Sequence, residues 1–253
     1  IKKDLRALES LTSLKELNKG IKHTNLDEIL ANPQNLPFSF EVEADMKNTK
    51  VNVLEFAGPG TFLPDTTSYK QADAPKLLTI LSEQTIKLLT MAGVNKKDAR
   101  EYVKNGLAFD QKLAKIVKST EEWSDYPACY NPVSYEDFVA EFKTFDMAAA
   151  LQKVLPIKPK QIIVMEPRFL EHAEELINEN NFAEIKGWMI MSFINDHAHL
   201  LSQAFREAAF PFNQALTGQG ELAPVNRHAY YIANASFSEP MGIYYGKKYL
   251  GAD

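Results

Sequence analysis

The sequence of 253 residues predicts a mainly α-helical protein with a small antiparallel β-hairpin and one additional short strand. Apolar residues recur at helical spacing between capping residues over most of the chain. Within about 38–57, apolar and polar residues alternate with the period of a strand. A short apolar run at 161–165, ended by Pro167, is typical of a buried strand. We expect one domain, residues 1–253.

Composition narrows the class of protein. A hydrophobic content of 45% and a charged content of 24% are ordinary for a soluble globular protein. The net charge of −5 argues against a nucleic-acid partner or an anionic membrane surface, and no apolar run is long enough to span a membrane. The single cysteine, Cys129, excludes an internal disulfide. We expect a cytoplasmic protein, although secretion without disulfides is not excluded.

The first third of the chain changes from helix to hairpin. A leucine at every third position predicts one helix through about residue 17, which Gly20 would stop, and Asn25 is a good N-cap for a short second helix that ends before Pro33. The hairpin strands follow on either side of the polar connection 45–50, with one face covered. A Gly-Pro-Gly turn at 58–60 then leads out of the second strand.

Helices account for most of the remainder. Asp73 with Pro75 begins a helix that ends at Gly93, and Asn95 with Asp98 begins another that runs to about Lys118. Residues 121–132 are expected to form a loop. Further helices are expected at 134–142, 146–155, 168–178 and 182–210; Pro211 would kink or end the longest of them, and shorter helices would follow around Pro224 and Pro240.

A search for zinc-peptidase chemistry gives a negative result. A zinc helix of the HExxH type needs two histidines one turn apart and a glutamate directly after the first. None of the five histidines is followed by Glu: His23, His172, His197, His199 and His228. His197 and His199 would point roughly 200° apart on a helix, so we expect one to face the core and the other the solvent. The sequence therefore offers no metal ligands and no catalytic residues.

Other acidic and thiol groups are also interpreted as structural. Glu121 and Asp125 have the ExxxD spacing of a third zinc ligand and its neighbour, but without a histidine pair we attribute this spacing to chance. Asp196 beside His197 lacks a nucleophile in a G-x-S-x-G context, so acyl-transfer chemistry is not expected. Cys129 has no base or cation nearby in the sequence and is interpreted as a partly buried free thiol.

Three further segments have both a functional and a structural interpretation. The turn at Gly58-Pro59-Gly60-Thr61 lacks the Gly-Lys-Ser/Thr ending of a phosphate-binding loop, so we interpret it as a tight turn. The glycosylation-like triplet at Asn234 is attributed to chance. The tyrosine pairs near the C-terminus are expected to pack between helices, with a peptide groove as the alternative: Tyr230, Tyr231, Tyr244 and Tyr245.

Several blocks, in one order, resemble a known family. They are VNVLEFAGPGTFLPDTTSY at 51–69, Tyr130-Asn131-Pro132, the strand at 162–167 followed by Phe169-Leu170, Ile185-Lys186-Gly187-Trp188, and Ala215-Leu216-Thr217-Gly218 with Arg227. Together they resemble the neprilysin family of zinc metallopeptidases and its bacterial oligopeptidase (PepO-type) branch. The resemblance covers nearly the whole chain. Where secreted animal members have a cysteine after the arginine, this chain has His228.

The resemblance implies the helical lobe that roofs the catalytic lobe of such a peptidase. The parent would use Zn²⁺ and a general-base glutamate to hydrolyse oligopeptides, and the two lobes would enclose a cavity that excludes folded substrates. The zinc ligands, the catalytic glutamate and the substrate contacts of the family lie downstream of the matching region, so none can be placed here. The substrate-binding residues of this chain are unknown.

We therefore expect a piece of a larger peptidase that contains neither zinc nor catalytic residues. Its partners would be the catalytic lobe of the same chain and oligopeptide substrates. The start at Ile1 agrees with a chain cut from something longer. The alternative is a stand-alone helical binding module without enzymatic activity, and a third class is an enzyme with a new site around Glu121, Asp196 and His197.

Overall fold

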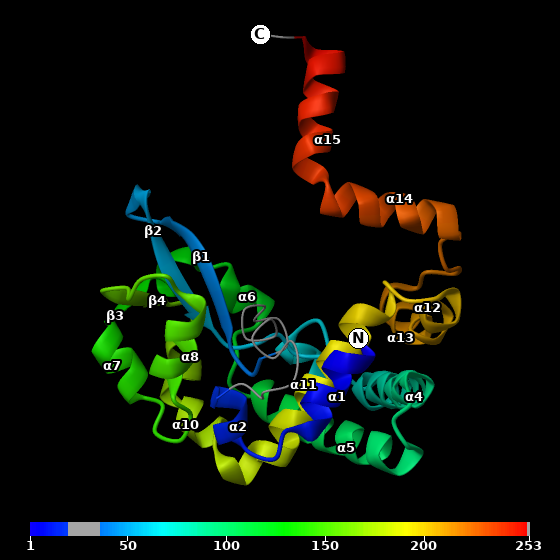
Figure 1. Cartoon of the computed structure of the whole chain (residues 1–253), viewed down its shortest axis with the longest axis horizontal. Coiled ribbons are helices and arrows are strands. Elements are labelled where there is room, and N and C mark those ends of the chain that lie inside the picture. Colours follow the sequence, from blue (N-terminus) through cyan, green and yellow to red (C-terminus); the bar gives the residue numbers. More distant parts are fainter. Residues whose placement is uncertain (20–35, 252–253) are drawn as a thin grey trace.

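A computed structural model describes residues 1–19 and 36–251 of the chain. It contains a helical body, a sheet on one side of that body, and a C-terminal helical arm that leads away from both (Figure 1). This arrangement confirms the predicted mainly α-helical class. The helix expected at Asn25 and the stop at Gly20 lie outside the described residues.

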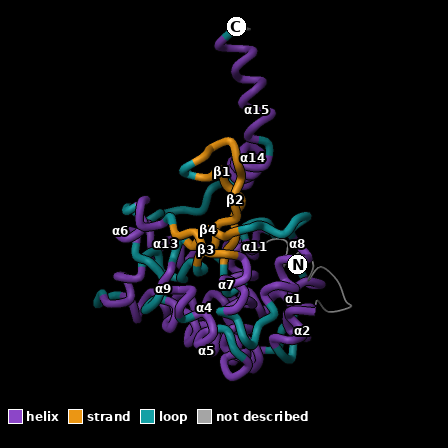
Figure 2. The backbone as a smooth tube through the Cα atoms, turned by 90° about the vertical axis from the view of Figure 1, so that its left-hand side faces the viewer, coloured by secondary structure: helices purple, strands orange, loops and turns teal. Residues whose placement is uncertain are grey.

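The four strands of the sheet are arranged in the order β1-β2-β4-β3 (Figure 2). Strands β1 (Ser39–Asp45) and β2 (Asn48–Ala57) form the predicted antiparallel hairpin, with Phe40 opposite Phe56. The predicted strand at 161–165 is β4 (Gln161–Val164), which pairs with β2 in parallel. β3 (Asn131–Ser134) pairs with β4 in antiparallel fashion at the far edge.

The strand β3 was not predicted, because residues 121–132 read as a loop. The segment also holds two short helices, α6 (Thr120–Trp123) and the 3₁₀-helix η3 (Tyr126–Cys129). Pro132 has no backbone N–H to donate to a ladder and therefore disfavours a strand assignment. An edge strand tolerates proline because one side of its backbone has no neighbour.

The N-terminal leucines form two helices rather than the single helix predicted: α1 (Lys2–Ser10) and α2 (Leu14–Lys19). Leu11 is extended, with φ −62° and ψ 130°, and the next helix begins with its own local cap. The Glu16 carboxylate accepts from the backbone N–H of Thr12 at 2.6 Å, and the Ser13 hydroxyl accepts from the N–H of Glu16 at 3.2 Å. The leucine spacing remains a correct guide to burial, since all five are buried: Leu5, Leu8, Leu11, Leu14 and Leu17.

Three long helices form the centre of the body: α4 (Ala74–Ala92), α5 (Lys96–Leu113) and α11 (Phe182–Ala198). Asp73 and Pro75 stand at the start of α4 as predicted, but the Asp73 side chain accepts no capping hydrogen bond. The other two predicted caps are present. Gly93 ends α4 in the left-handed region with φ 104°, and the Asn95 side chain accepts from the N–H of Asp98 at 2.9 Å at the start of α5. The helix α5 ends at Leu113, earlier than expected, and turns continue to Val117.

Helices α5 and α11 touch at two glycines. A Cβ atom on Gly187 would lie 2.5 Å from the carbonyl oxygen of Tyr102 and 2.7 Å from the nitrogen of Gly106. A Cβ atom on Gly106 would lie 2.5 Å from the sulfur of Met191. Only glycine allows the two backbones to approach this closely.

Shorter helices connect the sheet to this centre. The expected caps hold for two of them, since the Ser134 and Asp146 side chains accept from backbone N–H groups at the starts of their helices. The predicted helix 168–178 is divided at His172. These helices are η2 (Thr66–Lys70), α7 (Tyr135–Ala140), α8 (Met147–Val154), α9 (Pro167–Glu171), α10 (Ala173–Leu176) and η4 (Glu179–Asn181).

The single helix predicted for 182–210 is wrong. The chain leaves α11 after Ala198 and starts again as α12 (Gln203–Ala208) and α13 (Phe210–Thr217). Pro211 lies in the first turn of α13, where its missing N–H costs little, so it begins a helix instead of ending one. Leu200 is 53% exposed in the break.

The pieces expected around Pro224 and Pro240 form the C-terminal arm, residues 225–250. It consists of α14 (Val225–Ser236), α15 (Ser238–Tyr245) and a π-helical segment η5 (Gly246–Leu250). None of its residues is buried in the structure. In both Figure 1 and Figure 2 the arm and the β1–β2 hairpin project from the same side of the body.

Aromatic side chains form the core between the sheet and the helices. Phe56 on β2 packs edge-on against Phe138 of α7, with 4.8 Å between ring centroids, and Phe38 packs against Phe145 at 5.3 Å. All four are buried. Of the helices in 1–19 and 36–251, none has the length and apolar character needed to cross a bilayer.

Candidate functional site

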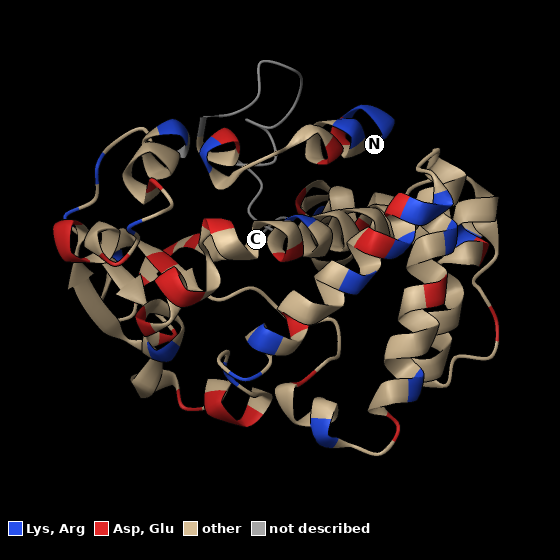
Figure 3. Cartoon of the chain, turned by 90° about the horizontal axis from the view of Figure 1, so that it is seen from below, with Lys and Arg blue, Asp and Glu red and all other residues tan. Residues whose placement is uncertain are grey.

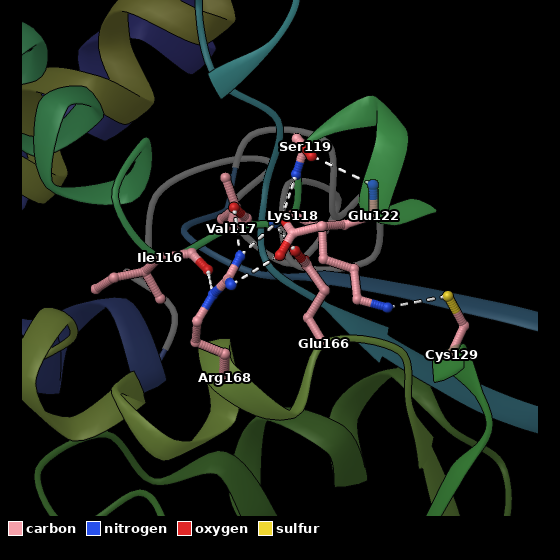
Figure 4. Close-up of polar contacts among 8 residues, drawn as sticks. All are labelled: Ile116, Val117, Lys118, Ser119, Glu122, Cys129, Glu166 and Arg168. Carbon is pink, nitrogen blue, oxygen red and sulfur yellow. Dashed lines mark hydrogen bonds and ion pairs between the residues drawn. The ribbon is translucent and has the colours of Figure 1, made fainter. Parts of the chain in front are cut away.

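The turn that follows β2 is held by a buried carboxylate. Glu166, which is 2% exposed, follows β4 and points toward Lys118 (Figure 4). Its two carboxylate oxygens accept from the backbone N–H of Gly58 at 2.7 Å and from that of Lys118 at 2.5 Å. Burial raises the pKa of Glu166, against the lowering effect of these two hydrogen bonds. Glu166 thus joins three segments that are far apart in the sequence.

Gly58 is confined as well as hydrogen-bonded. A Cβ atom there would lie 2.7 Å from Val117 Cγ1 and 2.9 Å from Phe169 Cδ2. The interpretation as a tight turn is therefore supported by contacts on both sides of the glycine. The close approach explains why the backbone needs glycine at this point of the turn.

Arg168 fixes the neighbouring segment from the outside (Figure 4). Its guanidinium donates to the carbonyl oxygens of Ile116 and Val117 at 2.5 and 3.1 Å and to both carboxylate oxygens of Glu122 at 2.8 and 3.0 Å. Hydrogen bonds from Arg168 and from the Ser119 backbone lower the pKa of Glu122 to about 2. This fork-to-fork geometry holds the start of α6 against α9.

A second buried carboxylate, Asp110 of α5, holds the residues that follow the 58–60 turn. It accepts from the backbone N–H of Phe62 at 2.9 Å and from the hydroxyl of Tyr69. Burial raises the pKa of Asp110 to about 6, although the hydrogen bonds lower it. Burial and the Asp110 charge also raise the pKa of Tyr69. Residues 58–69, which form the second part of the 51–69 block that carries the family resemblance, are therefore anchored at both ends.

Cys129 lies in a setting that the sequence did not predict. The thiol is fully buried rather than partly buried, and the Lys118 ammonium lies 3.1 Å from its sulfur (Figure 4). The expectation that no cation is nearby was wrong, because eleven residues and a change of direction separate the two in the sequence. The Lys118 ammonium also lies 5.2 Å from the centroid of the Trp123 ring.

The two central histidines do not form a metal site. His197 turns back along α11, where its Nδ1 lies 2.8 Å from the carbonyl oxygen of Phe193, and His199 is exposed after the end of the helix. The carbonyl oxygen of His199 lies 2.8 Å from Nε2 of His228. The expectation of one more buried and one solvent-facing histidine is in agreement with these positions.

The remaining acidic candidates lie at the surface. Glu121 and Asp196 are exposed, and Asp125 caps η3 by accepting from the N–H of Ala128. Among residues 1–19 and 36–251, no group of three or more His, Cys, Asp or Glu side chains could hold a metal ion. These described residues therefore do not fit the zinc site of a metallopeptidase.

Charged residues of both signs are interspersed over the face drawn in Figure 3. The more distinctive surface is the C-terminal arm, which carries most of the exposed large apolar and aromatic side chains of the described residues. They are Val225, Tyr230, Tyr231, Phe237, Met241, Ile243, Tyr244, Tyr245, Tyr249 and Leu250. Monomeric proteins rarely expose a contiguous surface of this kind unless it binds something.

The tyrosines of this arm correct an expectation. Tyr230, Tyr231, Tyr244 and Tyr245 are 45–62% exposed, so they do not pack between helices of this chain. The base of the arm is nevertheless held in place, because buried Arg206 donates to the carbonyl oxygen of Ala223 at 2.8 Å. The sequence missed this difference because an arm and a core helix have the same apolar spacing.

Comparison with known proteins decides the family. The model for the N-terminal part of peptidase family M13 matches residues 1–253. The chain belongs to peptidase family M13. A neutral endopeptidase of Lactobacillus helveticus is 61% identical over 90% of the M13 chain, and one of Lactococcus lactis subsp. cremoris is 32% identical over 99% of it.

Solved structures agree with the fold of the M13 chain. PepO of Lactobacillus rhamnosis superposes with a TM-score of 0.88 at 29% identity, over 100% of the M13 chain and 40% of that structure. The zinc metalloprotease Zmp1 of Mycobacterium tuberculosis shares the fold, with a TM-score of 0.82 at 18% identity. The chain spans 35–39% of the length of the two neutral endopeptidases. The neprilysin-like, PepO-type resemblance seen in the sequence is thus confirmed.

Two residues that organise this region, Asp110 and Glu166, were not singled out from the sequence. One signal was available for Glu166: it is an acid immediately after a buried apolar strand and before a proline. Such a carboxylate, placed at the end of a strand in the core, needs buried donors. Asp110 gave no comparable signal, since an acid within a helix usually faces solvent.

Proposed function

We propose that residues 1–253 form the helical lobe of a zinc metalloendopeptidase and act together with a catalytic lobe that lies outside this chain. Membership of family M13, with about 35–40% of the length of its relatives, supports a division of labour between two parts. We assign the zinc and the general base to the other part; among the described residues no cluster of His, Cys, Asp or Glu side chains could hold a metal ion. We propose oligopeptides as the substrates and the cytoplasm as the location of the parent.

The single observation that carries this proposal is the exposed apolar arm. Its tyrosines and aliphatic side chains stand away from the body without a covering element among the described residues. Exposing a surface of this composition to water is unfavourable in free energy. Contact with another protein surface buries the apolar side chains and removes this cost. We assign the arm, residues 225–250, to contact with the catalytic lobe of the same parent chain.

The role proposed for the lobe is to limit substrate size. A lobe that covers a catalytic surface can exclude water and folded chains while it admits short peptides. It contributes access and enclosure rather than proton transfer. The alternative, a stand-alone binding module, would need no second lobe and would leave the arm exposed in the complete protein.

The test compares the 253-residue chain with the full-length parent. We expect metal analysis to find stoichiometric zinc in the parent and none in the 253-residue chain, and we expect only the parent to cleave peptides. A series of substrates, from short peptides to a folded protein, should show a length above which cleavage by the parent stops. Tight zinc binding and peptidase activity in the 253-residue chain would contradict the proposal.

A second measurement addresses the arm directly. Replacing Ile243 and Tyr244 by Asp in the parent should lower peptidase activity by disturbing contact between the lobes. The same pair in the 253-residue chain should leave its unfolding free energy within about 0.5 kcal/mol, because both side chains are exposed there. Full activity of the substituted parent would exclude the arm as a contact surface.

A further inference from the structure

The outer edge of strand β1 is unpaired among the described residues. The strand order β1-β2-β4-β3 places β1 at one edge of the sheet, paired only with β2. A free strand edge presents backbone N–H and C=O groups that can pair with an added extended segment. The hairpin projects from the body on the same side as the C-terminal arm (Figures 1 and 2).

One face of the hairpin carries three carboxylates. In the β1–β2 register Glu41 lies directly opposite Glu55, and Glu43, two residues along β1, lies opposite Val53. Side chains two apart on a strand share a face, so all three carboxylates point to the same side of the sheet. Like charges directly opposite each other on a sheet destabilise it.

This arrangement is not balanced by neighbouring cations in the structure. No hydrogen bond or ion pair within the described part of the chain reaches the side chains of Glu41, Glu43 or Glu55. Burial and, to a smaller extent, the charges of Glu43 and Glu41 raise the pKa of Glu55. The face therefore carries a cost in folding that a bound cationic group would reverse.

A pocket adjoins the carboxylates. It has a volume of about 210 Å³ and is lined by Glu41 and Glu55 together with Trp123 and Met165. The Trp123 ring already has the Lys118 ammonium 5.2 Å from its centroid. We therefore assign Trp123 and Met165 to apolar contact with a side-chain stem, and the carboxylates to recognition of its charged end.

From the free edge, the charge of the face and the adjoining pocket, we propose that the β1–β2 hairpin binds an extended peptide segment that carries Lys or Arg. The peptide backbone pairs with β1, and a basic side chain lies beside Glu41 and Glu43 and reaches toward Glu55. Cross-strand neighbours are about 5 Å apart, so a long basic side chain spans the distance from a third strand to Glu55. The edge provides affinity and the carboxylates provide selectivity.

This inference deepens the proposed function, since it names basic peptides as a class of substrate that the helical lobe would hold. It does not need the catalytic lobe in order to be tested. Binding by the 253-residue chain is therefore measured without cleavage, and its outcome is independent of the zinc and activity measurements above.

The experiment titrates the 253-residue chain into a fluorescein-labelled peptide of about eight alternating Lys and Val residues, the length of a typical strand, and follows fluorescence anisotropy. We expect saturable binding that weakens as salt is added. A peptide of alternating Glu and Val should not bind. A Lys–Val peptide with N-methylated backbone should bind more weakly, because it cannot donate to the β1 edge.

The decisive comparison uses two triple variants that remove the same number of negative charges. The variant Glu41→Gln/Glu43→Gln/Glu55→Gln should bind about tenfold more weakly, since exposed ion pairs contribute about 0.2–1 kcal/mol each. The matched control replaces three exposed carboxylates elsewhere, Glu101, Glu171 and Glu221, by Gln. The control should bind within about twofold of the unmodified chain.

Thermal unfolding tests whether the hairpin variant binds weakly only because it is less stable. The hairpin variant should unfold at the same or a higher temperature than the unmodified chain, because the repulsion between Glu41, Glu43 and Glu55 is relieved. Weaker binding together with unchanged or higher stability supports a peptide site. Equal binding by the two triple variants, or equal binding of the Lys–Val and Glu–Val peptides, overturns the inference.

Discussion

Replacing Glu166 by Ala tests whether its carboxylate holds the turn at Gly58 and the segment at Lys118 against the end of β4. The substitution leaves the backbone N–H groups of Gly58 and Lys118, now bound at 2.7 and 2.5 Å, without their acceptor. Each unsatisfied buried donor costs about 1–3 kcal/mol. Part of this loss is offset because the desolvation of Glu166 itself disappears, so we expect a net destabilisation of about 2 kcal/mol or more.

Glu166→Gln gives a graded comparison. Glutamine keeps one acceptor oxygen but turns an amide group toward the second N–H, so its loss should be smaller than that of alanine. The control is Glu171→Gln, an exposed site five residues further on. It should change the unfolding free energy by less than about 0.5 kcal/mol.

The assay is urea unfolding followed by tryptophan fluorescence, combined with hydrogen exchange at the amides of Gly58 and Lys118. Both amides should exchange faster in Glu166→Ala while amides of α4 and α5 change only with global stability. An unfolding free energy within about 0.5 kcal/mol of the unmodified chain, with both amides still protected, would refute the structural role of Glu166.

Three further predictions follow from contacts described above. Gly187→Ala should destabilise the chain by about 1–3 kcal/mol or more in thermal unfolding, because the new methyl group meets backbone atoms of α5, whereas Gly242→Ala, with nothing within 4 Å, should be neutral or slightly stabilising. Asp110 binds its proton more tightly in the folded chain, because its pKa is raised there to about 6 from 3.8. Protonation of Asp110 therefore contributes fully to the unfolding free energy below about pH 4, and this contribution is lost as the pH rises to about 6. Urea unfolding should show that loss as about 3 kcal/mol, and Asp110→Asn should remove that part of the slope; an identical slope would contradict the assignment. Cys129 should react with a thiol reagent many times more slowly in the native chain than in urea because it is fully buried, and equal rates would contradict its burial.

The elements with strong local signals could be predicted from the sequence. Asn95 begins a helix by capping the N–H of Asp98, and Pro75 fits the first turn of another helix; both depend on neighbouring residues alone. The hairpin follows from alternation for the same reason. The apolar run at 161–165 also identified a strand, although not its parallel partner.

Features that depend on tertiary contacts were beyond this kind of reasoning. The periodicity of 182–210 continues through the break at His199, where only packing decides that the helix ends. The edge strand that contains Pro132 is stabilised by β4, which lies some thirty residues later. Likewise, the exposed arm has the apolar spacing of a buried helix, so its tyrosines could not be distinguished from core residues.

The parallel pairing of β2 with β4 has a consequence for how the chain folds. The contact from Glu166 to Gly58 closes a loop of 108 residues. This loop contains α4, α5 and the shorter helices between β2 and β4. Closing a flexible loop of that length costs about 4 kcal/mol of chain entropy. The β1–β2 hairpin and the α4–α5 pair need only short loops and can form first. We expect the pairing of β2 with β4 to be a late step in folding, so that the sheet is completed only after the helices between its strands have formed.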